Sequence, residues 1–572
     1  MPQENISNTW EVTGLLEKLQ AEKNSANELQ KRKHEDWNDN YELYRNRVKT
    51  NRLTQRQAVN IPLMKETIKT LLSKIDDAPN IDWKELASDA DKEIVYQEIW
   101  DTGYRDNKLE LIDILDKKNV LLYGLSTKKL NISENGVDVD VLDTYDVVFD
   151  PLMKAGEIET ARFIINQNIF KSAREILADE RYTKKGKDSL KIWIDSTAGI
   201  TQSRDNKEVW ERKMERMKDM EVGHKDFALF AGGDRLINLT EHYTSTWNVK
   251  KKAWERRVVV YADNSVELLN ETLLDLIGME EWPFVVWSED PETNDIYPDA
   301  VADLVRTPNK VLNVWFSQMI ENRTLKNFQM HWFLPAQGYT PQTYTPGPGV
   351  MLPAPPGEDI NKVIKPVEIN GLDDTMGAIE ALTTIVERGT GATAIEKGQA
   401  EQGTQTLGEI QVLVGKSMER AVGMAKFYRM AWYELATKWD KMMHANAPEV
   451  IKLYKTGKSG KVYAKKAFAS DWTSEAGYMP VIRSSSEQES EAIKSIQKFS
   501  YLLSQFPQNM ALRKIAQKRM LESVDLTPEE LKQVEEAEMQ GQPEQAMAQP
   551  AQPNAMADIE SKLGQLTSLA TA

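Results

Sequence analysis

The sequence contains no cysteine and no long apolar run. None of the 572 residues is cysteine, which excludes disulfides, thiolate metal sites and thiol catalysis. No segment approaches the roughly 18 consecutive apolar residues of a membrane-spanning helix. The first ten residues, MPQENISNTW, lack the basic end and apolar stretch of a secretion signal. These absences predict a protein of a reducing cytoplasm with no membrane partner.

Basic residues are outnumbered. The chain has 72 lysines and arginines against 88 acidic residues, a formal charge of −16. Affinity for DNA comes mainly from cations that neutralise phosphates, so the balance argues against tight general DNA binding. It is compatible with a channel that repels phosphates and lets DNA slide. Charge that only keeps the protein soluble is the alternative.

Signatures of catalysis are also missing. The sequence has no H-E-x-x-H pattern and no G-x-S-x-G elbow, and its five histidines are scattered. Two Gly-Lys-Ser tripeptides, at 415–417 and 457–459, lack the P-loop glycine five positions earlier, where Ile410 and Lys452 stand. We therefore predict no enzyme, no cofactor and no metal site.

Two further groups of residues have a structural interpretation. Four aspartates near the strand at 137–142 lack the glycine and closing glutamate of a calcium loop, which favours solvated strand faces over a cation site. Four tryptophans at helix and strand spacing favour core or subunit contacts over base stacking. These residues are Asp138, Asp140, Asp143 and Asp146, and Trp282, Trp287, Trp315 and Trp332.

Residues 1–290 have the pattern of an α+β domain. Charged amphipathic periodicity predicts helices, and alternation of apolar and polar residues predicts an antiparallel sheet. The predicted helices cover 13–44, 63–75, about 85–122 and 206–220. The predicted strands cover 137–142, 146–151, 162–170, 236–247 and 254–262, with the last two paired through a turn at 248–252.

Beyond Pro298 the pattern becomes helical. Thr307 suits the N-cap and Pro308 the first position of a helix that ends at Phe328. Its expected face consists of Val311, Val314, Trp315, Gln318 and Asn322. A segment at 335–359 with seven prolines and four glycines predicts an extended loop element. A helix over 374–388 and a glycine-rich loop over 389–405 follow.

The strongest signal is a continuous apolar face from Leu407 to Met442. Its residues recur every three or four positions, which predicts a helix roughly 54 Å long. Residues 452–483 then have β character, 486–536 have the pattern of charged helices, and 538–572 form a tail rich in Gln, Ala and Pro.

This order of elements resembles the portal family of tailed bacteriophages. Local motifs agree with the resemblance: they are RQAVNIP at 56–62, DVVFDP at 146–151, WPFVV at 282–286, YPDAV at 297–301 and GTGAT at 389–393. The chain departs from the family at Pro298, where a glycine is usual. The resemblance implies a mostly helical α+β portal fold with wing, stem, clip and crown regions.

The implied regions follow the predicted elements. The wing comprises 1–297 and, with the long helix, 406–485. The two stem helices are 298–328 and 371–388, and the clip is 329–370. The tunnel loop is 389–405, the crown 486–537 and the tail 538–572.

The resemblance further implies a non-enzymatic ring, usually of twelve subunits, at one vertex of the virion capsid, assembled in the bacterial cytoplasm. Double-stranded DNA passes through it without sequence specificity during packaging and ejection. The implied partners are the large terminase subunit, then head–tail adaptor or tail proteins, with the major capsid protein and a scaffold protein around the ring.

The resemblance also assigns contact residues. Channel-lining residues of the tunnel-loop region are Arg388, Thr390, Glu396, Lys397, Gln399, Glu401 and Gln402. Terminase or adaptor contacts in the clip are Tyr339, Tyr344, Pro346, Pro348 and Pro355. Residues 371–409 contain seven acidic residues and only two basic ones, a balance that suits a channel wall that repels phosphates. Exposed helix ends would give the same count.

Three alternatives remain open on sequence alone. A shorter head–tail connector is another ring, a packaging motor or nuclease would be an enzyme, and a scaffold would have no role with DNA. The missing P-loop glycines argue against the motor, and the wing–stem–clip order argues against the connector.

Overall fold

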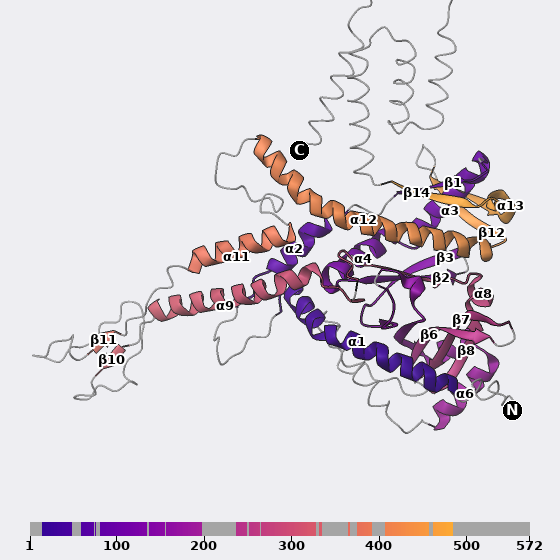
Figure 1. The fold of residues 1–572 in the computed structure, drawn as a ribbon, viewed down its shortest axis with the longest axis horizontal. Helices are drawn as coiled ribbons and strands as arrows, with labels where there is room; N and C mark the ends of the chain where they lie inside the picture. Colours follow the sequence, from indigo (N-terminus) through magenta and orange to yellow (C-terminus); the bar gives the residue numbers. More distant parts are fainter. Residues whose placement is uncertain are drawn as a thin grey trace, which may run out of the picture. The chain divides into compact units, whose positions relative to one another are not determined.

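The computed structural model (Figure 1) describes residues 14–47, 59–73, 75, 80–87, 89–133, 136–154, 156–196, 236–248, 251–262, 265–293, 295–327, 331–333, 364–366, 375–391, 407–456 and 462–483. The chain divides into two compact units, residues 1–485 and 486–572, and every described residue belongs to the first. Within this described part, no helix combines the length and apolarity needed to cross a membrane.

The N-terminal helices match prediction only in part. Helices α1 (Gly14–Tyr44) and α2 (Leu63–Leu72) are confirmed. The single helix expected over about 85–122 is wrong, because strand β1 (Asn80–Glu85) precedes α3 (Ala90–Asp106) and α4 (Leu109–Tyr123). Lys108 has a φ of 51°, a left-handed conformation that ends α3 before α4 begins.

A five-stranded antiparallel sheet forms the centre of the N-terminal part. Its order is β4-β5-β6-β7-β8, formed by Val147–Phe149, Phe163–Ser172, Leu236–Asn248, Ala253–Ala262 and Val266–Thr272. The predicted pairing of β6 with β7 is confirmed, with Trp247 opposite Trp254.

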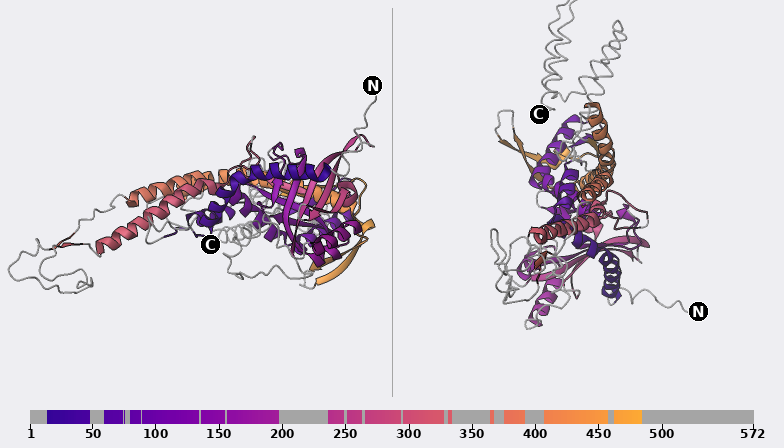
Figure 2. Two further views of the ribbon diagram at one scale, coloured as in Figure 1. Left: turned by 90° about the horizontal axis from the view of Figure 1, so that it is seen from below. Right: turned by 90° about the vertical axis from the view of Figure 1, so that its left-hand side faces the viewer.

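Helices cover both faces of this sheet. Successive residues of β7 point to opposite faces, and Val259 packs with Leu19 of α1 whereas Val260 belongs to the main core. Helices α5 (Ala173–Ala178), α6 (Lys184–Ser196) and α8 (Leu273–Ile277) follow β5 or β8, and α6 packs on β8. Thus α1 and α6 lie on opposite sides of the sheet (Figure 2, right).

A smaller antiparallel sheet has the order β3-β2-β9. The expected strand at 137–142 is confirmed as β3 (Gly136–Leu142), whereas β2 (Ser126–Ser133) was not predicted. Strand β9 (Phe284–Trp287) completes the sheet, and a 3₁₀ turn at Ile158–Thr160 lies close to it.

Helix α9 (Val301–Asn327) begins earlier than predicted. The expected N-cap at Thr307 is wrong and Pro308 lies inside the helix. The Ala300 N–H donates to Asp303 Oδ2 over 2.7 Å, and the Asp303 N–H donates back to the Ala300 carbonyl over 3.0 Å. This reciprocal pair satisfies donors at the true helix start.

The core-facing side of α9 also differs from prediction. Its buried residues include Val305, Asn309, Leu312, Asn313 and Ser317. Of the predicted face, Val314 is 38% exposed and Gln318 is exposed, so only Trp315 packs against the core. Three of these five buried residues are polar or small, and apolar periodicity selected the wrong face.

The remaining elements lie C-terminal to α9. Short strands β10 (His331–Phe333) and β11 (Ile364–Pro366) pair, and α11 (Thr375–Thr390) and α12 (Leu407–Ala445) follow. The long helix is confirmed, at 39 residues. The expected β character after it is confirmed by β12 (Val450–Thr456), β13 (Val462–Phe468) and β14 (Tyr478–Arg483), with the short α13 (Ala469–Trp472). The predictions for 206–220, 335–359 and 486–572 lie outside the described residues.

Candidate functional site: a helical arm and its anchors

Helices α9 and α11, with strands β10 and β11, form a structure that we call the arm. The two helices lie side by side and run in opposite directions (Figures 1 and 2). Ile379 and Val386 of α11 are buried in the same core as Leu312 of α9. Because β10 pairs antiparallel with β11, the chain leaves along α9 and returns along α11.

Polar side chains of α9 bind the extended segment that precedes α2. Asn313 Oδ1 accepts the N–H of Ile61 over 2.8 Å, and Asn309 Oδ1 accepts the N–H of Met64 over 2.9 Å. Asn309 Nδ2 also donates to the Ile61 carbonyl over 3.1 Å. Residues four apart lie on one helix face, so both asparagines reach the same segment.

The clamp extends one further turn. Ser317 Oγ accepts the N–H of Val59 over 3.1 Å. Buried backbone donors without partners are costly, and here a helix supplies side-chain acceptors that a neighbouring strand would otherwise provide. We call Asn309, Asn313 and Ser317 the neutral clamp of the arm.

Ion pairs join α9 to α1 at the surface. Arg306 Nη1 lies 3.0 Å from Asp36 Oδ1, and Lys310 Nζ lies 2.5 Å from Asp39 Oδ2. Both pairs are partly exposed, so each contributes about 0–1 kcal/mol. They orient α9 on α1 more than they stabilise it.

Helix α12 is held by buried charges instead. Lys117 of α4 pairs with Asp113 over 2.6 Å, and the Tyr428 hydroxyl of α12 donates to Asp113. Burial raises the pKa of Asp113, against the opposing effects of Lys117 and Tyr428. Burial, reinforced by Asp113, also raises the pKa of Tyr428, which keeps the phenol protonated as the donor.

A second buried pair lies beside the first. Lys128 of β2 and Asp116 of α4 are both 0% exposed and lie 2.5 Å apart. The Trp287 indole N–H donates to Asp116 over 2.8 Å, and Lys128 Nζ lies 5.3 Å from the ring centre of Trp432 on α12. We call this pair, together with Asp113 and Lys117, the charged anchor of α12.

A third lysine fastens α12 closer to its end. Lys438 is buried and donates to the Phe284 carbonyl of β9 over 2.6 Å. It also pairs with Glu159 over 2.8 Å and with Glu434 over 2.7 Å. Burial alone would raise the pKa of Glu159, but Lys438 and Arg256 together outweigh it and the pKa is lowered.

The structure describes two of the twelve predicted contact residues. Arg388 is exposed on the last turn of α11. Thr390 was expected on a loop, but it belongs to α11, is 1% exposed and donates its hydroxyl to the Val386 carbonyl over 2.8 Å. It is therefore a packing residue in this chain, and α11 ends where Gly391 takes a φ of 75°.

The other ten lie outside the described residues, namely Glu396, Lys397, Gln399, Glu401, Gln402, Tyr339, Tyr344, Pro346, Pro348 and Pro355. Of the seven acids counted between 371 and 409, Glu380 is exposed and Glu387 half-buried on α11, and Glu409 belongs to α12. The two described contact residues, Arg388 and Thr390, both lie on the last turn of α11.

The described residues contain no group of three or more potential metal ligands. Asp140 and Asp143 are exposed, whereas Asp146 is buried and accepts from Asn168 over 3.0 Å. Trp282 and Trp287 are core residues, as expected. Residues 415–417 lie inside α12, where no phosphate loop can form.

Sequence reasoning missed both the neutral clamp and the charged anchor. The clamp has a faint signal, because Asn309, Asn313 and Ser317 recur every four residues. The anchor has almost none, because Asp113, Asp116 and Lys117 have the pattern of a solvated helix face when α4 is considered alone.

A family model for the phage SU10 portal protein matches residues 21–567 of the chain. The chain belongs to this portal family. The match spans the arm, both sets of anchors and most of the second compact unit. A search of curated proteins gives no match.

Membership of the portal family agrees with what the buried polar groups do. Each charge of the anchor is satisfied by an opposite charge or a hydrogen bond between secondary-structure elements. These groups thus join α4, β2, β9 and α12, and their geometry is that of structural joints.

Proposed function

We propose that the chain is the subunit of a ring-shaped channel at one vertex of a phage capsid. The genome is packed through this channel and later ejected. The subunit carries out no catalysis of its own. The observation that carries the proposal is the out-and-back arm of a chain whose family match runs from residue 21 to 567.

We assign the wing to 1–297 and 406–485, the stem to 298–328 and 371–388, and the clip to 329–370. The tunnel loop is 389–405, the crown 486–537 and the tail 538–572. The ranges of α9 and α11 support the stem assignment, with α11 continuing to Thr390. The division of the chain after Ser485 supports a separate crown.

The anchors fit the mechanical needs of such a channel. A subunit of a channel through which DNA is driven has to keep its stem fixed to its wing under load. The neutral clamp couples α9 to the segment before α2, and the charged anchor couples α12 to α4. Buried polar groups paired in this way favour one arrangement over shifted ones, because a shift would leave a buried charge or N–H unpaired.

The partners follow from this role. We infer a homo-oligomeric ring, a dodecamer, that binds the large terminase subunit and then a head–tail adaptor through the clip. The capsid and scaffold proteins surround it. DNA passes without sequence-specific contacts, in line with the net charge of −16.

Negative-stain electron microscopy with mass by light scattering tests the proposal. We expect closed rings with a central hole wide enough for duplex DNA. Because such rings can need scaffold or capsid to assemble, the same measurement is made on protein co-expressed with both. A compact dimer, or a filled particle without a channel, would contradict the proposal.

A further inference from the structure

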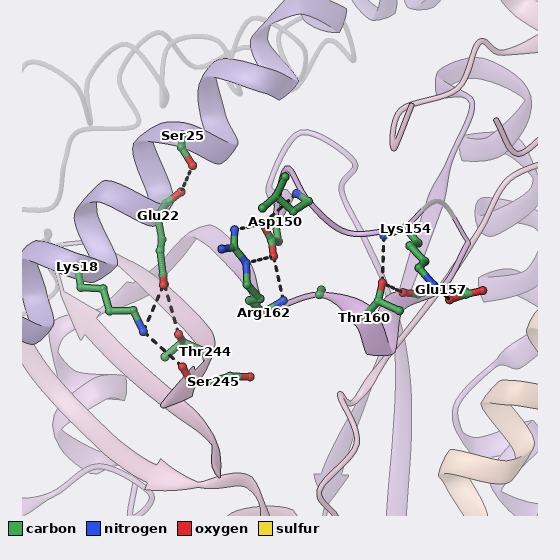
Figure 3. A network of polar contacts seen from close by, with 12 residues as sticks. Lys18, Glu22, Ser25, Asp150, Lys154, Glu157, Thr160, Arg162, Thr244 and Ser245 are labelled. Atoms are coloured by element: carbon green, nitrogen blue, oxygen red, sulfur yellow. Dashed lines mark hydrogen bonds and ion pairs between the residues drawn. The ribbon is translucent and has the colours of Figure 1, made fainter. Parts of the chain in front are cut away.

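A pocket of about 1210 Å³ opens where α1 meets the edge of the five-stranded sheet. It is lined by one side of α1, the start of β5, the hairpin end of β7 and the first turn of α8. Figure 3 shows Lys18 and Glu22 reaching from α1 to Thr244 and Ser245 of β6, with Arg162 close by. We call it the α1 pocket.

The α1 pocket has an excess of carboxylates, six against four cations. The cations are already paired: Lys18 with Glu22, Arg162 with Asp150, Lys251 with Glu255 and Arg256 with Glu159. In the described part of the chain, no cation pairs with Glu280, which lies on the pocket wall. The pocket thus has unneutralised negative charge to offer.

Large apolar side chains stand exposed beside these carboxylates. Trp254 is 69% exposed and Leu274 is 52% exposed, and both line the pocket. Trp254 makes an edge-to-face contact with Trp247, itself 50% exposed, with ring centres 5.6 Å apart. Exposed tryptophan beside charge is typical of the centre of a protein–protein contact.

The complementary surface is on the other side of the same sheet. Helix α6 has four lysines against two aspartates, and Ile192 on its outer side is 70% exposed. Lys191 of α6 pairs with Asp188 over 3.4 Å, whereas Lys184, Lys185 and Lys187 form no ion pair with any described residue. Gly186 brings α6 against the backbone of β8, where a Cβ would lie 2.8 Å from the Glu267 carbonyl oxygen, so α6 is held firmly in place.

We propose that α6 of one copy docks into the α1 pocket of the next copy. Its lysines face Glu280 and the other carboxylates, and Ile192 packs against Trp254 and Leu274. A contact between different surfaces on opposite sides of a subunit is head-to-tail and generates a ring when the rotation closes. The inference rests on the proposed ring and names two surfaces that build it.

The absence of cysteine gives a clean test by cross-linking. A full-length Lys185→Cys chain is mixed with a full-length Glu280→Cys chain at a concentration where the wild type assembles. A short bismaleimide is then added. We expect a cross-linked heterodimer in the mixture and no dimer from either variant alone, because a head-to-tail contact brings 185 only to 280. The matched control replaces Lys185→Cys by Lys65→Cys, an exposed site on α2, and gives no dimer.

Charge reversal provides an independent measurement. Lys184→Glu/Lys185→Glu weakens association by about tenfold or more, since like charges then face each other. Glu280→Lys in the same chain restores part of the loss, whereas Lys65→Glu/Lys69→Glu has no effect. Rings that form with no heterodimer would overturn this contact and leave the channel proposal intact. If the wild-type chain gives no rings and the mixed cysteine variants give no heterodimer, even with scaffold and capsid proteins present, both proposals are overturned.

Discussion

Helices α9 and α12 are both long, yet they are fastened to the body of the protein in opposite ways. Helix α9 uses neutral amide and hydroxyl groups that bond to backbone, with ion pairs only at its surface. Helix α12 rests on lysines and aspartates that are almost fully buried. The comparison teaches that buried ion pairs, whose charges are expensive to desolvate, are concentrated at α12. The contacts of α9 are neutral hydrogen bonds, each of which involves a smaller desolvation energy.

The energetic consequences differ accordingly. A buried ion pair contributes little net stability compared with apolar packing, but removing one partner leaves an uncompensated charge. A neutral hydrogen bond lost from a buried site costs the desolvation of one group. We therefore expect the α12 joint to fail abruptly and the α9 joint to weaken in steps.

The largest effect is expected from Lys128→Met. This change leaves the Asp116 carboxylate buried without its cation and lowers the free energy of unfolding by about 3–5 kcal/mol. Chemical denaturation followed by circular dichroism measures the loss. The double variant Asp116→Leu/Lys128→Met recovers much of it, because neither charge remains. A single variant as stable as the wild type would contradict the charged anchor.

The next prediction concerns the contact between the end of α4 and the residues that precede α9. Gly124 ends α4 with a φ of 83°, and a Cβ there would lie 2.1 Å from the Pro298 carbonyl oxygen just before α9. Gly124→Ala is expected to cost about 2–4 kcal/mol, from backbone strain plus overpacking. Gly156 is a matched control, because its φ is 74° but no atom lies within 4 Å of a Cβ. Equal losses in the two variants would show that the contact with Pro298 does not matter.

Removal of the neutral clamp gives a smaller effect. Asn313→Ala leaves the Ile61 N–H without its acceptor and is expected to cost about 1–3 kcal/mol. Hydrogen exchange should speed up at Ile61 while the amides around Asp116 keep their protection. Ser317→Ala, which affects the more peripheral Val59, is expected to cost less. Faster exchange at both joints would mean that they are one cooperative unit.

The smallest effects concern two histidines that titrate in opposite directions. Burial lowers the pKa of His242 despite Glu22, so the folded state loses stability as the pH falls below the unfolded value of about 6.5. Asp440 raises the pKa of His444 on α12 against the effect of burial. The stability that protonated His444 contributes to the folded state is complete below a pH of about 6.5. It is lost as the pH rises through the pKa of His444 in the folded state.

Thermal melting between pH 5 and 8 separates the two histidines. In His242→Gln the acid-side loss should shrink, and in His444→Gln the acid-side gain should disappear. Pairing each variant with the wild type at the same pH cancels all other titrations. Parallel curves for both variants would contradict the opposite signs.

Much of the fold could be predicted from the sequence where a pattern is local. The β6–β7 hairpin, the long α12 and the helices on either side of residues 335–359 follow from alternation or from helical spacing. Strand β1 could not be predicted this way. Its alternating Ile81 and Trp83 span too few residues, and its partner β14 lies almost 400 residues later.

The candidate site was less accessible to prediction. The periodicity of α9 pointed to Val314, but the buried face contains Asn309 and Asn313, because the segment before α2 needs hydrogen-bond partners that no apolar residue offers. Pro308 has the pattern of a helix start, yet the preceding turn is stabilised by Asp303. At each of these positions, contacts formed in the folded protein outweighed the local preference of the sequence.

The pairing of β1 with β14 determines when the newly made chain can complete its first compact unit. Residues 80–85 leave the ribosome early, but their partner at 478–483 emerges only after almost all of the first compact unit has been synthesised. Until then Ile81 and Trp83 lack the strand that covers them, and the sheet edge stays open. The β1 edge therefore closes late in translation, and only chains that extend through residue 483 have this edge paired when they meet one another.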